Sequence, residues 1–79
     1  MSFEVHVIVT FRTPPHEAVM TALDHQFGQA LHEHGSKLVS LSEHVSVADE
    51  TDAVEFVRAL VLAAIPPGST ITSISATPA

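Results

Sequence analysis

An apolar stretch near the C-terminus, Asp52–Ile65 (DAVEFVRALVLAAI), constrains the fold of this chain more than any other segment. At about 100° per residue, its apolar side chains do not stay on one face of a helix. One face carries Val54, Val57, Val61, Ala64 and Ile65, and another carries Phe56, Ala59, Leu62 and Ala63. A helix that is apolar all round is usually buried on more than one side, but one small sheet covers only one side. The second side therefore predicts an interface with another molecule, most simply a second copy.

The length and composition of the chain support this expectation. A chain of 79 residues is one domain, near the lower limit of what a hydrophobic core stabilises unaided. It contains no cysteine, so disulfides and thiolate metal sites are excluded as supports. Self-association is therefore an expected source of additional stability, as a dimer or a larger assembly.

The charge of the chain excludes two classes of partner. Its net charge is −6, and its fixed cations are Arg12, Lys37 and Arg58. Neither nucleic acid nor an anionic membrane surface is expected as a partner, because both require clustered basic residues. The apolar run Ala59–Ile65 is too short to span a bilayer, and the N-terminal residues alternate instead of forming a signal peptide. A cytoplasmic protein without a cofactor is the expectation.

The first two predicted elements are a strand and a helix. In Phe3–Arg12, apolar residues from Phe3 to Phe11 alternate with Glu4, His6, Ile8, Thr10 and Arg12, which is typical of a strand with one buried face. The sequence Thr13-Pro14-Pro15 then predicts a helix start, with Thr13 as the cap. This helix is predicted to continue to about His34 and to end at Gly35. Its predicted buried stripe is Val19, Leu23, Phe27, Ala30 and Leu31.

The segment Lys37–Ala48 is rich in β-forming residues, and its division depends on Glu43. In one continuous strand, Glu43 would share the buried face of Val39, Leu41 and Val45, which is costly for an unpaired carboxylate. We therefore expect a break near Ser42-Glu43 that makes two short strands. The alternative is one long strand.

The remaining elements are a helix and a strand. Asp52 and Glu55 are spaced like a capping pair at the start of the second helix, which is expected to end before Pro66-Pro67-Gly68. Ser69–Ala76 predicts a final strand, and the opposite parity of Ile71 and Ile74 predicts a bulge or an exposed edge.

Together these elements predict an α+β fold of the ferredoxin-like βαββαβ type, with two helices on one face of an antiparallel sheet. The alternative is a three-stranded βαβαβ arrangement with one long middle strand. The βαββαβ plan supports many unrelated activities, so the fold alone assigns no function.

Six histidines are the unusual feature of the composition, and His6 and His44 form the most promising pair. In a ferredoxin-like order both lie on the open face of the sheet, where they are candidates for acid–base catalysis. Arg12 is a candidate anion clamp, and Glu4, Thr10 and Ser42 are candidate ligand-binding residues beside them. The same polar residues also fit an ordinary solvated face.

Three hypotheses for function follow. The first is a self-associating interaction or ligand-binding module without a catalytic motif of its own, whose interface is Phe56, Ala59, Leu62 and Ala63. The second is a small cofactorless enzyme that uses His6, His44 and Arg12 on the open sheet face. The third is a divalent-metal binder that uses histidines and carboxylates, although no metal-ligand motif is found in the sequence.

Overall fold

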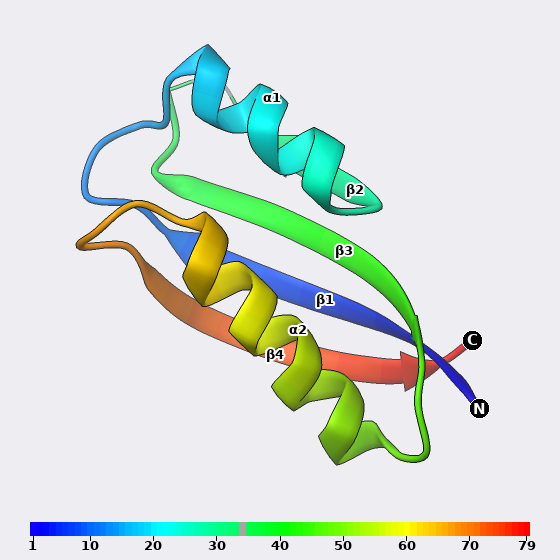
Figure 1. The fold of residues 1–79 in the computed structure, drawn as a ribbon. Helices are drawn as coiled ribbons and strands as arrows, with labels where there is room; N and C mark the ends of the chain where they lie inside the picture. Colours follow the sequence, from blue (N-terminus) through cyan, green and yellow to red (C-terminus); the bar gives the residue numbers. More distant parts are fainter. Residues whose placement is uncertain (34) are drawn as a thin grey trace.

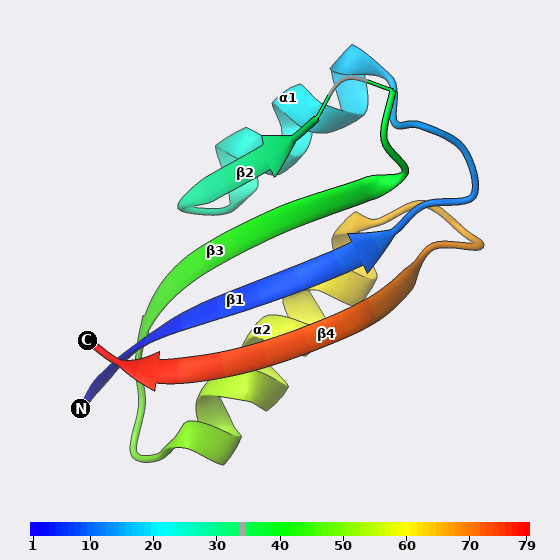
Figure 2. The same cartoon turned by 180° about the vertical axis from the view of Figure 1, so that it is seen from behind.

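The computed structural model describes residues 1–33 and 35–79 and has the ferredoxin-like βαββαβ architecture predicted from the sequence (Figure 1). The strands form one antiparallel sheet in the order β2-β3-β1-β4, so β2 and β4 are the edge strands (Figure 2). The elements are β1 (Ser2–Thr10), α1 (Glu17–Gln26), β2 (Gln29–His32), β3 (Leu38–Ser46), α2 (Glu50–Ala64) and β4 (Thr70–Pro78).

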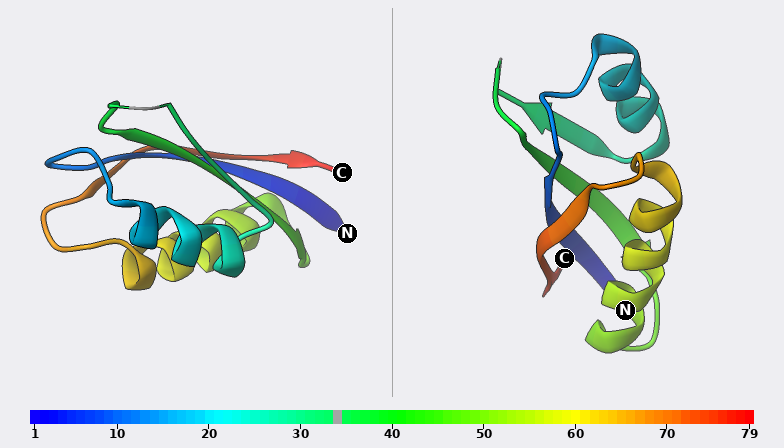
Figure 3. Two further views of the ribbon diagram at one scale, coloured as in Figure 1. Left: turned by 90° about the horizontal axis from the view of Figure 1, so that it is seen from above. Right: turned by 90° about the vertical axis from the view of Figure 1, so that its left-hand side faces the viewer.

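The two helices cover one face of the sheet and leave the other face open (Figure 3). α1 packs beside β2, and α2 packs mainly against β4 and β1. The core lies between these layers and is entirely apolar among the described residues. Its members are Phe3, Val5, Val7, Val9, Phe11, Leu23, Phe27, Val39, Leu41, Val45, Ala53, Val57, Val61 and Ala76.

The alternating strand predicted at the N-terminus is confirmed in β1. Its odd-numbered residues from Phe3 to Val9 are buried, whereas Glu4, His6, Ile8 and Thr10 face the other side of the sheet. β1 lies between β3 and β4, so its outward residues stand in the middle of the open face.

The predicted helix from Pro14 to about His34 is wrong in its second half. α1 ends at Gln26, Phe27 adopts an extended conformation, and Gln29–His32 form β2. His34 lies outside the described residues. The helical spacing of Ala30 and Leu31 was misleading because pairing with the outer edge of β3 places Leu31 on the open face, exposed, and Ala30 toward the helices. The predicted cap is also wrong, since the cap residue is His16 and its side chain makes no capping hydrogen bond.

The predicted break in Lys37–Ala48 is wrong, because β3 runs without interruption through Glu43. Glu43 does face the helix side, opposite Val5, but it is only half-buried. Its carboxylate lies beside Gly28, where a β-carbon would be at ordinary contact distance (3.4 Å) from Glu43 Oε1. Glu43 Oε1 also accepts a hydrogen bond from the His44 backbone N–H (3.1 Å). Because β3 is one undivided strand, the fourth strand of the sheet is β2, formed by Gln29–His32.

The second helix and the last strand lie close to their predicted positions. The capping residue of α2 is Asp49 and not Asp52: Asp49 Oδ1 accepts a hydrogen bond from the Asp52 backbone N–H (2.9 Å). The pairing of β4 with β1 shifts register between Ile8 and Val9, which is the irregularity expected from the parity of Ile71 and Ile74. Within the described ranges, neither helix has the length and apolarity needed to cross a membrane.

Candidate functional site

The open face of the sheet gathers most of the polar side chains that the sequence singled out. β1 contributes Glu4, His6 and Thr10, and β3 contributes Ser42 and His44. They share one face because alternate residues of a strand point to the same side. In the strand register, Glu4 pairs with His44 and His6 pairs with Ser42. His6 and His44 are therefore diagonal neighbours, the arrangement in which long side chains reach one another.

The imidazole of His6 is held by the strand beside it. His6 Nδ1 and Ser42 Oγ form a hydrogen bond of 3.0 Å, and on the other side His6 pairs with Ser75 of β4. An activated serine nucleophile needs a base that a third group orients. This exposed serine–histidine contact positions the His6 ring beside β3, and no third group hydrogen-bonds to that ring among the described residues.

The imidazole of His44 lies beside a carboxylate. His44 Nδ1 is 3.4 Å from Glu4 Oε2, and the two side chains are 56% and 37% exposed. A carboxylate beside one ring nitrogen favours the proton on that nitrogen and leaves the other nitrogen as a base or ligand. Both histidines thus contact a neighbouring strand through Nδ1, and in each the Nε2 atom has no protein partner among the described residues.

Two of the candidate residues lie apart from this pair. Arg12 follows the far end of β1, and its aliphatic stem lies against Gly68, where an added β-carbon would overlap Arg12 Cδ. Six residues of strand span about 20 Å, so the structure does not bring Arg12 to His6. Thr10 hydrogen-bonds to the Thr72 hydroxyl, four residues along β1 from His6.

The metal hypothesis finds little support in this geometry. Over residues 1–33 and 35–79, no group of three or more histidine, cysteine, aspartate and glutamate side chains is placed to hold a metal ion. A structural transition-metal site normally uses four such ligands. The histidine pair could provide only part of a coordination shell.

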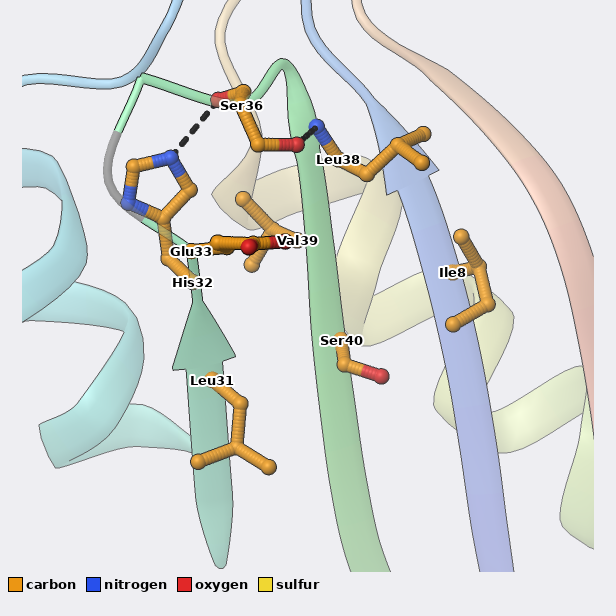
Figure 4. A pocket seen from close by; sticks show the side chains of 8 residues that line it. All are labelled: Ile8, Leu31, His32, Glu33, Ser36, Leu38, Val39 and Ser40. Atoms are coloured by element: carbon orange, nitrogen blue, oxygen red, sulfur yellow. Dashed lines mark hydrogen bonds between the residues drawn. The ribbon is translucent and has the colours of Figure 1, made fainter.

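An apolar hollow of about 410 Å³ lies on the same open face, toward the end of β1 (Figure 4). Leu31, Ile8 and Leu38 contribute its apolar lining from three different strands. His32 closes one end, where its Nε2–H donates to the Ser36 carbonyl oxygen (2.7 Å). Sequence reasoning missed this hollow because it assigned Leu31 and His32 to a helix. The sequence Gln29–His32 carried no clear strand signal, because its two apolar residues, Ala30 and Leu31, are adjacent and do not alternate with polar ones.

A second surface lies on the helix layer. Phe56 and Leu62 of α2 are 53% and 57% exposed, and Ala59 and Ala63 between them are also exposed. We call these four residues the α2 apolar surface. It is the set expected from the sequence to remain uncovered by the sheet, since the buried residues of α2 are Ala53, Val57 and Val61.

Comparison with known proteins gives no further assignment: no family model, curated protein or solved structure matches this chain.

Proposed function

We propose that this chain is a self-associating α+β module that functions as a dimer or larger assembly in which the α2 apolar surface is covered. The observation that supports this most directly is the exposure of Phe56 and Leu62, each more than half exposed although the sheet already covers the opposite side of α2. Contiguous exposed apolar side chains usually mark an interaction surface.

A second copy is the occupant that this surface fits best. If two α2 helices cross antiparallel with the axis at Ala59, Phe56 of each copy meets Leu62 of the other, since both are three residues from the centre. The small side chain of Ala59 permits close approach at that centre. The antiparallel arrangement also separates the acidic N-terminal turns, which carry Glu50 and Asp52. In this proposal the assembly acts in the cytoplasm and binds neither nucleic acid nor membranes.

Sedimentation equilibrium of the full chain and of Phe56→Asp tests this proposal. The wild-type chain is expected to have at least twice the mass of one chain, and Phe56→Asp is expected to raise the apparent Kd at least about tenfold. Leu31→Asp is the matched control, since Leu31 is 56% exposed but lies on the opposite face of the molecule. A wild-type chain that stays monomeric at millimolar concentration contradicts the proposal.

A second candidate function is small-molecule binding or acid–base chemistry at His6 and His44. It is favoured by one observation: both Nδ1 atoms contact side chains of the adjacent strand, which orients two imidazoles on one open face. Phosphate, acetate and Zn²⁺ are suitable probes, because imidazoles bind anions when protonated and metals when neutral.

NMR titration with each probe separates the anion, acid–base and metal hypotheses. Shifts at His6 and His44 that exceed those at His16 and His25, which are exposed residues at the start of α1 and within it, support a site on the open face. Equal shifts at all four histidines contradict it. An unchanged melting temperature with Zn²⁺ contradicts the metal hypothesis.

A further inference from the structure

We infer that the free edge of β4 is a strand-pairing surface for a second copy of this chain. Two copies would join antiparallel, β4 to β4, and form one continuous eight-stranded sheet. This inference rests on the proposed self-association and specifies how one contact between copies is made.

The first observation is the set of backbone groups on β4 that are not paired with β1. The Ala79 N–H donates to the Ser2 carbonyl oxygen (3.0 Å), and Ser75 and Thr77 pair with the even-numbered residues His6 and Glu4 of β1. In an antiparallel pair, alternate residues direct their N–H and C=O groups to opposite sides. The groups of Ile74 and Ala76 therefore point to the free edge, where the described residues provide no neighbouring strand.

The second observation is the lack of charged side chains on β4 itself. Natural edge strands are usually protected from pairing by lysines, by inward-pointing charges or by short length. β4 is nine residues long, and the chain contains no charged residue after Arg58. The bulge near Thr72 and the proline at Pro78 protect its two ends, but the middle of β4 has neither feature. β2, the other edge strand, has only four residues.

The charge distribution also identifies a second copy as the suitable partner. No side chain of β4 is charged, so two copies, each with net charge −6, can pair along β4 without placing like charges opposite one another on the paired strands. A continuous sheet of two such copies is a closed, two-fold symmetric arrangement.

The third observation is a groove between α2 and β4 that opens along the same edge. Arg58 and Leu62 line it from α2, and Ile71 and Ile74 line it from β4. α2 lies over β4 and β1, as Figures 1 and 3 show. With strands about 4.8 Å apart, edge pairing brings the two α2 helices to about 10 Å, which is the normal distance for packed helices. Strand pairing therefore brings the side of α2 that carries Arg58 against the same side of α2 in the other copy.

The charged residues of α2 complement one another across this arrangement. Glu55 and Arg58 border one hollow on the side of α2 and are one turn apart. In an antiparallel helix pair with its axis between them, Arg58 of each copy lies opposite Glu55 of the other.

Phe56 does not line the groove at β4. A chain that uses both the β4 edge and the Phe56 side would form species larger than a dimer.

Hydrogen exchange of the unmodified protein is the most direct test. The amides of Ile74 and Ala76 are expected to exchange at least about tenfold more slowly at high protein concentration than at low concentration. The amides of Ser75 and Thr77, which face β1, serve as internal controls and should not respond to concentration. Concentration-independent exchange at Ile74 and Ala76 in a protein that does self-associate overturns this inference and leaves the proposed self-association standing.

Two sets of variants give an independent test by sedimentation. Ser73→Lys with Ser75→Lys places positive charges beside the edge and is expected to raise the apparent Kd at least about tenfold. Ser40→Lys with Ser46→Lys, on the same open face but on β3, is the matched control. Arg58→Glu should also weaken association, and adding Glu55→Arg to it should restore the affinity. Unchanged association in both the Ser73/Ser75 and Arg58 variants overturns the inference, whereas a monomeric wild-type chain overturns the proposed function as well.

Discussion

Gly28 lies directly against the backbone of Ser42, so that a β-carbon on Gly28 would be 3.3 Å from the Ser42 carbonyl oxygen. This contact occurs where the chain leaves α1 and enters β2, beside the middle of β3. It explains why the first helix ends where it does: the corner after Phe27 must pass close to β3 before Gln29 can pair with Ser42.

Substitution of Gly28 should therefore destabilise the protein. The atom that a side chain would meet belongs to a strand backbone, which cannot move aside without disturbing the sheet. Gly28→Val is expected to lower the free energy of unfolding by about 1–3 kcal/mol, as overpacking does elsewhere. Urea denaturation provides the measurement. Gln29→Val, one residue further on an exposed position of β2, should stay within about 0.5 kcal/mol. Equal effects of the two substitutions would refute this role of Gly28.

Gly68 and Arg12 form a second close contact, which couples the turn before β4 to the end of β1. Gly68 has φ +88°, and an added β-carbon would overlap Arg12 Cδ. Gly68→Ala is expected to cost about 1–2 kcal/mol from the left-handed backbone conformation alone. The displaced Arg12 stem adds to this cost. A double-mutant cycle separates the two contributions. In a chain that already carries Arg12→Ala, Gly68→Ala should cost only the free energy of the left-handed backbone conformation, because the overlap with the Arg12 side chain is gone. Strict additivity of the two substitutions would contradict the contact.

The cap of α2 predicts a difference between two nearby aspartates. Asp49→Ala removes the carboxylate that accepts from the Asp52 N–H and should cost about 1 kcal/mol. Asp52→Ala removes only a favourable charge in the first turn of the helix and should cost a few tenths of a kcal/mol, within about 0.5. Thermal or urea unfolding of both variants compares them under the same conditions. A larger loss of stability for Asp52→Ala than for Asp49→Ala would mean that Asp52 caps the helix, as expected from the sequence.

The sequence predicted those elements whose pattern is set by local spacing. β1 alternates over nine residues, and α2 repeats its apolar positions over four turns, so both were recognised without tertiary information. The open face followed from them, because the ferredoxin-like order places β1 beside β3 and brings His6 near His44.

The errors occur where long-range contacts override local pattern. Ala30 and Leu31 continue the helical spacing of Leu23 and Phe27. The segment Gln29–His32 nevertheless forms a strand, because its backbone pairs with the outer edge of β3. Glu43 appeared too polar for a buried strand position, but it is only half-buried, and its carboxylate lies beside Gly28, fifteen residues earlier in the sequence. Neither relationship can be read from one stretch of sequence, since each depends on two segments that meet only in the fold.

The contact between His44 and Glu4 gives a prediction for the candidate site itself. With Nδ1 of His44 3.4 Å from Glu4 Oε2, the neutral imidazole should carry its proton mainly on Nδ1. Glu4→Gln should therefore shift the tautomer population of His44 toward Nε2–H, and two-bond ¹H–¹⁵N spectra of the ring measure this directly. The tautomer population of His6 should not change, because its Nδ1 contacts Ser42 instead. The stability of the protein should change by less than about 1 kcal/mol, since both side chains are partly exposed. If Glu4→Gln changed the tautomer populations of both histidines equally, the rings would be responding to the overall charge of the open face. The individual contacts with Glu4 and Ser42 would then not determine their tautomers.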